Sequence, residues 1–392
     1  MLIGLTAEQS ALRAELRAYF ADVLSPEERA AMLVDRHGPA YRELIRRLGR
    51  DGWLGLGWPT EYGGRGLGPV EQQLFVNEAA RADVPLPSVT LETVGPTLQR
   101  YGTDEQRARF LPAILRGEVH FAIGYTEPEA GTDLASLQTR AVRDGDEYVV
   151  DGQKIFTTGG HDADYVWLAC RTDPQAPKHR GISILIVDTR DPGYSWTPII
   201  TSDGAHHVNA TYYRGVRVPV AMRVGEENRG WRLITTQLNH ERVMLGPAGR
   251  LGGLIDRVRS WASARTDPDG TPLLDRSDVR RALARAHATQ RANELLNWQV
   301  AASAGRDLGA AEIADASATK VFAAQAAQWV GPLLEHVVAR HGDPGDPDTA
   351  ALLRWLDVQR KRNTVLTFGG GVDEIQRELI ATAGLGLERV PR

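Results

Sequence analysis

The stretch LNHERVML, residues 238–245, places a carboxylate at a point where a helix could carry proton chemistry. On a 3.6-residue period, Glu241 lies beside Gln237 one turn before it and Leu245 one turn after it, near an apolar face. Desolvation there would raise the pKa of the carboxyl group, which suits a general base working near neutral pH. A half-buried glutamate paired with Arg242 explains the same pattern, so the helix alone leaves both interpretations open.

Composition narrows the class of protein that carries this helix. The chain has 392 residues, which predicts two or three structural units instead of one core. Hydrophobic residues make up 42% and charged residues 24%, as is typical of a soluble globular protein. The net charge is -4 and no block of like charges stands out, so neither nucleic acid nor a membrane surface is expected as a partner.

Targeting and metal signals are weak along the sequence. The first twenty residues carry acidic side chains and predict a helix of the mature protein, not a signal peptide, and no apolar run has transmembrane length. Cys170 is the only cysteine, which fits a reducing cytoplasm. The adjacent pair His206 and His207 lacks metal-ligand spacing, so no metal is expected.

The order of predicted elements is helical, then β-rich, then helical again. We expect three domains: an N-terminal helical domain (1–120), a middle β domain (121–225) and a C-terminal helical domain (226–392). This is not the alternating pattern of a doubly wound α/β fold. The first helix is predicted over Ala7–Asp22, with Thr6 as N-cap and Gln9 completing a capping box. Four long helical runs are predicted in the last domain: Trp231–Arg265, Arg276–Gly305, Ala310–Arg340 and Ala350–Thr367.

Turn signals divide the β region and the final helices. Asp-Gly pairs at 144–145 and 151–152 are predicted to break strands. Arg265–Pro272 and Gly342–Asp348 are rich in Asp, Pro and Gly, and we expect them to be flexible linkers.

Three loops combine glycine with polar or aromatic side chains. The loop at 125–133, YTEPEAGTD, offers hydroxyls and backbone amides to a polar heterocycle or a phosphate, although an ordinary capped turn explains it too. FTTGG at 156–160 pairs an aromatic ring with hydroxyl donors, as a flat cofactor would require. FGGG at 368–371 either lets the backbone approach a ligand or makes a sharp turn.

Several long motifs together resemble the acyl-CoA dehydrogenases. The 125–133 loop and GDEYVVDGQKIFTTGG (145–160) are similar to the flavin-binding signatures of that family. QLNHERV (237–243) and LTFGGGVDEIQR (366–377) look like the base-bearing subunit of the actinobacterial dehydrogenases that shorten steroid side chains. The resemblance covers essentially the whole chain. It implies an α+β, mostly α fold with an N-terminal helical domain, a middle β-barrel-like domain and a C-terminal four-helix bundle.

The resemblance also implies a cofactor site and a reaction. Family members use FAD: a glutamate removes the α-proton of an acyl-CoA while the β-hydride passes to flavin N5. By match to the family motifs, the residues expected at the flavin or its ribityl–phosphate chain are Tyr125, Thr126, Gly131, Thr132, Phe156 and Thr158.

The position of the base is the main departure from the common family pattern. Most members carry it just before the last helix, where this chain has Gly370. A minority place it on the earlier helix, at the position of Glu241. The resemblance therefore implies that Glu241 is the base, that the Gly370 N–H polarises the thioester carbonyl, and that Arg242 gives structural or CoA-side support.

A second departure concerns groups that family members lend to a neighbour's FAD. The two matching segments carry acidic residues that would repel a pyrophosphate: Asp267, Asp269, Asp343 and Asp346. As in the steroid α2β2 heterotetramers that the chain resembles, we expect a second, different subunit to supply the missing groups. An electron-transfer flavoprotein or similar acceptor would take the electrons.

Two other functions remain open at this stage. One is a flavin oxidase or N-oxygenase of secondary metabolism with the same fold, although it would not need a glutamate at position 241. The other is a non-catalytic partner subunit, which the lost FAD-lending motifs permit and the intact 125–133 loop disfavours.

Overall fold

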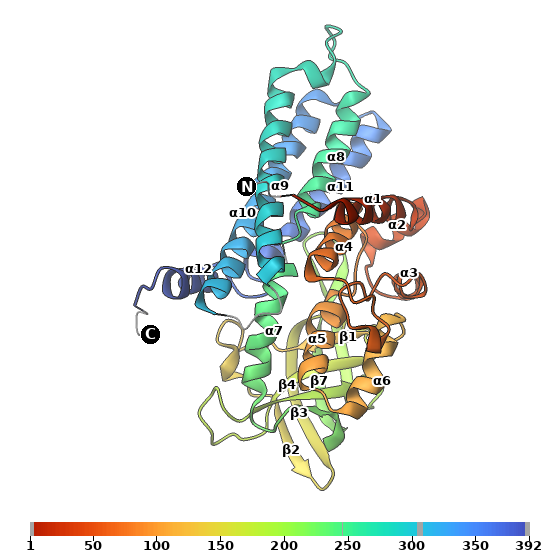
Figure 1. The fold of residues 1–392 in the computed structure, drawn as a ribbon. Coiled ribbons are helices and arrows are strands. Elements are labelled where there is room, and N and C mark those ends of the chain that lie inside the picture. The colour runs from red at the N-terminus through yellow and green to blue at the C-terminus, as the bar shows by residue number, and fades with distance from the viewer. Residues whose placement is uncertain (1–3, 245, 304–308, 389–392) are drawn as a thin grey trace. The chain divides into compact units, whose positions relative to one another are not determined.

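A computed structural model describes residues 4–244, 246–303 and 309–388, apart from the side chains of Val34 and of residues 238–244. Helices precede and follow one sheet, and the predicted α+β, mostly α class is confirmed (Figure 1). Packing divides the chain into two compact units. Unit 1 comprises residues 1–24, 68–85 and 242–392, and unit 2 comprises residues 25–67 and 86–241. The predicted three-domain boundaries stay a prediction.

The N-terminal region forms short, well-capped helices. They are α1 (Ala7–Asp22), α2 (Pro26–Val34), α3 (Pro39–Arg50), α4 (Pro69–Arg81), α5 (Gly95–Tyr101) and α6 (Asp104–Leu115). The capping box predicted for Thr6 and Gln9 is confirmed, because each side chain bonds the other's backbone N–H. The sequence analysis missed α2, although Ser25 and Glu28 form the same kind of box there, with Pro26 at the first helical position.

The sheet has eight strands in the order β6-β7-β3-β2-β4-β5-β8, with β1 beside β4. Their bounds are β1 (Phe121–Gly124), β2 (Arg140–Asp144), β3 (Glu147–Thr158), β4 (Tyr165–Arg171), β5 (Ile182–Asp188), β6 (Tyr194–Ile200), β7 (His206–Pro219) and β8 (Arg223–Val224). Its core includes the fully buried side chains of Tyr148, Val166, Leu185 and Val187. All strands belong to unit 2.

One of the two predicted Asp-Gly turns is wrong. Residues 144–145 do join β2 to β3 as a hairpin. Asp151 and Gly152 instead lie inside β3, where the pairing with β7 shifts register after Val150. A Cβ at Gly152 would lie 2.5 Å from the Thr139 hydroxyl, so glycine serves a close approach of two strands here and not a chain reversal.

The remaining helices are α7 (Gly230–Met244), α8 (Gly249–Ser263), α9 (Ser277–Ser303), α10 (Ala310–His341), α11 (Pro347–Asn363) and α12 (Asp373–Leu379). Helices α8 to α11 pack side by side as the expected bundle (Figure 1). The single run predicted over Trp231–Arg265 is wrong, because the chain leaves the helix between α7 and α8. Pro247 lies in that break, and it has no N–H with which to continue a helix.

In the described part of the chain, no helix is both long and apolar enough to span a bilayer.

Candidate functional site

A β-bulge on β3 presents Phe156 to the surface. Lys154 pairs with Thr211 and Thr157 pairs with Asn209, so two β3 residues face a single position of β7. Phe156 adopts a positive φ of 59° and is 60% exposed. A left-handed backbone at a bulky residue is strained, and such strain concentrates at functional sites. The bulge thus offers an aromatic ring to something other than the protein core.

The loop at 125–133 docks directly onto this bulge. The Ile155 N–H donates to the Thr126 carbonyl oxygen at 2.8 Å. One residue earlier, the Lys154 ammonium donates to the Tyr125 carbonyl at 3.0 Å and to the Glu127 carboxylate at 2.7 Å. The two motifs that the sequence analysis singled out separately therefore form one site.

A buried ion pair holds the loop in place. Lys154 is fully buried and Glu127 is 7% exposed. The backbone amides of Gln138 and Thr139 also donate to the Glu127 carboxylate, at 2.6 and 2.8 Å. Burial acts to raise the pKa of Glu127, but Lys154 and these hydrogen bonds outweigh it, so the pKa is lowered and the charged form is favoured.

The remaining predicted cofactor residues lie at the surface of the same unit. Thr126 is half-buried, whereas Gly131, Thr132 and Thr158 are exposed. Hydroxyl groups and a flat aromatic ring at one surface fit a cofactor with a planar heterocycle and a polar tail. These residues fit a flavin, although their contacts with one stay a prediction.

The side chain of Tyr125 points away from this surface. It is 8% exposed, accepts a hydrogen bond from Trp167 Nε1 at 3.2 Å and donates one to Gln237 Oε1. The Tyr125 hydroxyl is thus used inside the protein, so any flavin contact of this residue would come from its other atoms.

The residues predicted to act on the substrate are placed only in part. Glu241 and Arg242 belong to α7, but their side chains lie outside the described residues. Gly370 has a φ of +65° and is followed by Gly371 at +97°. A glutamate at position 370 would bring a Cβ into this left-handed region at a cost that glycine avoids.

The two acidic segments of unit 1 pair with each other. Arg265 Nη2 lies 2.6 Å from Asp346 Oδ2, and Arg276 Nε lies 2.8 Å from Asp267 Oδ2. His341 places one ring nitrogen 3.2 Å from Asp267. The guanidinium of Arg265, followed by the hydroxyl of Thr349, lowers the pKa of Asp346 to about 2. These segments are cross-linked, so the prediction of flexible linkers is corrected, and Arg265 is already paired with carboxylates.

Five histidines gather beside the end of β3. The rings of His161 and His206 stack with centroids 4.1 Å apart, and His37 lies 5.5 Å from His161. His207 lies 6.4 Å from His37. Burial and then the neighbouring imidazoles lower the pKa of His37 to about 3. Within the described residues, no three potential ligands are arranged to hold a metal.

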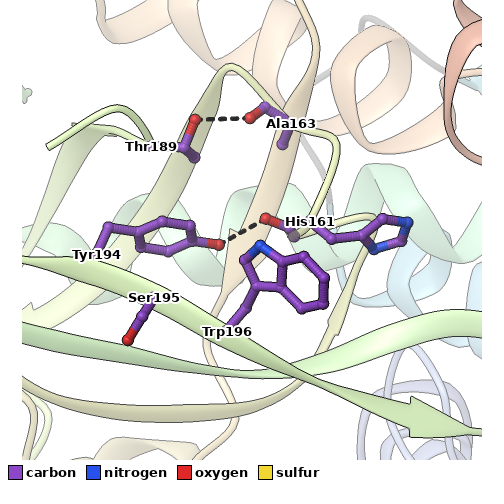
Figure 2. Close-up of a pocket in the computed structure, with 7 residues that line it drawn as sticks. His161, Ala163, Thr189, Tyr194, Ser195 and Trp196 are labelled. Carbon is purple, nitrogen blue, oxygen red and sulfur yellow. Dashed lines mark hydrogen bonds between the residues drawn. The ribbon is translucent and has the colours of Figure 1, made fainter. Parts of the chain in front are cut away.

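A small pocket adjoins these histidines but contains none of the predicted site residues (Figure 2). His161, Tyr194 and Trp196 line it. The Tyr194 hydroxyl donates to the Gly160 carbonyl at 2.7 Å, and the Thr189 hydroxyl donates to the Ala163 carbonyl at 2.7 Å. Both hydroxyls are engaged in holding backbone, so we assign the pocket no part in the reaction.

Domain-level comparison identifies the family. The N-terminal, middle and C-terminal domain models of the acyl-CoA dehydrogenases match residues 6–118, 122–216 and 228–385. The chain belongs to the acyl-CoA dehydrogenase family. It is therefore a flavin-dependent oxidoreductase, and the resemblance seen in the sequence is confirmed.

Relatives within the acyl-CoA dehydrogenases match over the full chain. Acyl-CoA dehydrogenase FadE29 of Mycobacterium tuberculosis is 67% identical over 392 residues, which is 100% of both proteins. In the ChsE4–ChsE5 complex from the same organism, a chain that is 48% identical superposes with a TM-score of 0.90 and full coverage of both chains. A chain of the Tcur3481–Tcur3483 steroid ACAD is 49% identical, with a TM-score of 0.91 and full coverage of both chains.

The sequence analysis missed three residues of this acyl-CoA dehydrogenase site. Lys154 and Glu127 lie inside the motifs that carried the resemblance, and a lysine at an inward-facing strand position was the available signal. Gln237 was noted as a neighbour of Glu241, but its bond to Tyr125 spans 112 residues and has no local signal.

Proposed function

We propose that this enzyme introduces an α,β double bond into an acyl-CoA thioester of a bulky substrate, a steroid side chain of the cholesterol type. The observation that carries the proposal is the docking of the 125–133 loop beside the strained, exposed Phe156. The steroid substrate is supported by the 49% identity to a protein described as a steroid ACAD. Placement in β-oxidation of such side chains follows from this substrate.

Glu241 is proposed to remove the α-proton. It lies on α7, one turn after the buried Gln237, and the helix therefore directs it to the same face. The left-handed backbone of Gly370 supports the base lying elsewhere than at that position. The Gly370 N–H is proposed to polarise the thioester carbonyl, and Arg242 to support the CoA side.

FAD is the proposed cofactor, and when bound it supplies the acceptor for the β-hydride. Thr126, Gly131 and Thr132 would bind its polar parts through the loop. Phe156 and Thr158, at the end of β3, would lie against its ring. Lys154 and Glu127 act beneath them by fixing the loop backbone.

A second acyl-CoA dehydrogenase-like subunit is proposed to complete the FAD site in an α2β2 heterotetramer. The internal pairing of Arg265 with Asp346 and of Arg276 with Asp267 supports this, because these segments then offer no spare cation to a neighbour's pyrophosphate. The similarity to a chain of the ChsE4–ChsE5 complex supports it as well. An electron-transfer flavoprotein or similar acceptor is proposed to reoxidise the enzyme.

The test is anaerobic mixing of the purified complex with a steroid side-chain CoA thioester. Wild type should bleach the flavin band, and Glu241→Gln should slow bleaching by at least a hundredfold while FAD stays bound. Glu105→Gln, an exposed carboxylate on α6, is the matched control and should react as wild type does. Unchanged bleaching in Glu241→Gln would remove the base assignment.

Two further measurements separate the alternatives. Rapid oxygen consumption without a CoA substrate would favour an oxidase. If the chain purified alone were a yellow homomer, the proposed heteromer would be wrong.

A further inference from the structure

A buried chain of hydrogen bonds joins the sheet to helix α7. Trp167 Nε1 on β4 donates to the Tyr125 hydroxyl at 3.2 Å, and that hydroxyl donates to Gln237 Oε1 on α7. The three side chains are 0%, 8% and 1% exposed, respectively. All three belong to unit 2, so the chain of bonds lies within one compact body.

This contact is the polar part of an otherwise apolar packing surface. Leu233 and Ile234, in the preceding turn of α7, are 3% and 0% exposed. Apolar contacts resist separation of a helix from its support but allow it to slide or rotate, whereas a hydrogen bond fixes direction. The bond from Tyr125 therefore defines the rotation of α7 at Gln237.

Gln237 also carries a hydrogen-bond donor that is not used by the protein. Among the described residues, its Nε2 is buried and has no partner. Because the Tyr125 hydroxyl already accepts from Trp167, exchanging the two ends of the amide would still leave one buried amide atom unpaired. Buried polar atoms without partners are rare in native proteins, and a bound ligand is one of the few explanations.

Helix periodicity connects this residue to the proposed base. Gln237 and Glu241 are four residues apart on α7 and so occupy the same face in successive turns. The Tyr125 end of the contact opens the 125–133 loop, which meets the bulge at Phe156. One side chain thus links the proposed cofactor loop to the helix of the proposed base.

We propose that Gln237 is a positioning residue. Held by Tyr125, it sets the rotation of α7 and hence the placement of Glu241, and its remaining N–H donates to a carbonyl oxygen of the bound flavin or of the acyl-CoA thioester. The inference rests on the proposed function, since it takes Glu241 as the base.

Three variants of the holo complex test it. Tyr125→Phe removes the tether, Gln237→Met removes the tether and the N–H at similar volume, and the double variant measures their coupling. Tyr148→Phe is the matched control, because Tyr148 is another fully buried tyrosine of unit 2 whose hydroxyl bonds Glu227 at 2.7 Å. Bleaching by a CoA thioester is followed across pH, together with the flavin spectrum before substrate is added.

Each single variant should bleach roughly ten- to a hundredfold more slowly, with a shifted pH profile, since small misplacements of a reacting group have effects of that size. The double variant should be no slower than Gln237→Met, because both changes break one linkage. A changed flavin spectrum in Gln237→Met before substrate is added would place the N–H on the flavin. A change only after the thioester binds would place it on the substrate.

Wild-type rates and pH profiles in both single variants, or effects that multiply in the double variant, would overturn the proposal. Equal slowing in Tyr148→Phe would mean general destabilisation and would overturn it too. These outcomes are separate from failure of the proposed function. That failure appears as normal bleaching in Glu241→Gln, whereas flat results here beside a slow Glu241→Gln remove only the role of Gln237.

Discussion

The Lys154 ammonium lies 2.7 Å from the Glu127 carboxylate, beneath the loop proposed to hold the cofactor. Both groups are withdrawn from water, and burial lowers the pKa of Lys154 while Glu127 opposes that shift. A charge in such a place is tolerated only with its partner. The pair therefore makes the shape of the loop depend on two side chains, one on each of the motifs.

Breaking this pair should cost far more than breaking a surface pair on the same loop. Lys154→Met leaves Glu127 charged and buried, so we expect a loss of about 3–5 kcal/mol in the free energy of unfolding, with weaker FAD retention. Lys178→Met breaks the exposed pair with Asp133, also 2.7 Å long, and should cost only about 0–1 kcal/mol. Urea denaturation and flavin content after gel filtration check both values. Equal effects of the two variants would contradict the assigned role of Lys154.

Acid should destabilise the protein through its buried histidines. Burial and then Arg42 lower the pKa of His120 to about 4, and the pKa of His37 is lowered to about 3. Because the unfolded chain takes up these protons near pH 6.5, stability is complete above that pH and falls as pH decreases toward 4. Each such histidine contributes about 1.4 kcal/mol per pH unit within that window.

The charged neighbours of this cluster limit the variant that can test it. Arg42 pairs with Asp162 and Asp164, and His207 lies 3.4 Å from Asp203. His120→Asn should flatten the fall of the melting temperature between pH 7 and pH 4. Replacing the exposed His287 in α9 in the same way should leave the slope as in wild type. A steep slope that persists in His120→Asn would show that other groups control acid sensitivity.

Two buried glycines in helices of unit 1 should respond in opposite directions to alanine. A Cβ at Gly249 would lie 1.7 Å from the Asn77 carbonyl oxygen, so Gly249→Ala forces α8 away from α4, with an expected loss of about 1–3 kcal/mol. A Cβ at Gly331 within α10 meets nothing within 4 Å, so Gly331→Ala should stabilise by about 0.5–1 kcal/mol. Melting curves of the two variants distinguish close packing from helix propensity.

His341 should stabilise the cross-linked end of unit 1. Its Nδ1 lies 3.2 Å from Asp267 and its Nε2 lies 2.9 Å from Asp278, so both ring nitrogens face carboxylates. His341→Leu would leave these acceptors without a buried donor and should cost about 1–3 kcal/mol. His336→Leu, an exposed position on α10, is the control and should change stability by less than about 0.5 kcal/mol.

Features that depend on neighbours in sequence were predictable. The Thr6 capping box joins residues three apart, and the hairpin at 144–145 joins adjacent strands, so the sequence alone defines both. The same local logic would have identified α2, because Ser25 and Glu28 are also three residues apart. Its omission reflects an overlooked signal and not a missing one.

Features that depend on distant partners were not predictable. Arg265 and Asp346 are 81 residues apart, and only the packing of the bundle turns two apparent linkers into one ion-pair network. Gly152 looked like a turn because nothing local reveals that Thr139 comes within 2.5 Å of its Cβ position. Side-chain contacts of this kind exist only after the backbone has brought the elements together.

The amino-acid sequence by itself determined the family, the fold class and the motifs that could bind a flavin. Its motifs also carried the proposal that Glu241 replaces a base missing at Gly370. The tertiary structure alone decided that Tyr125 turns inward to Gln237 and that Lys154 fixes the loop beside Phe156. The physical reason is that motif identity is recorded in residue order, whereas the direction of a side chain depends on which distant residues bury it and offer it hydrogen bonds.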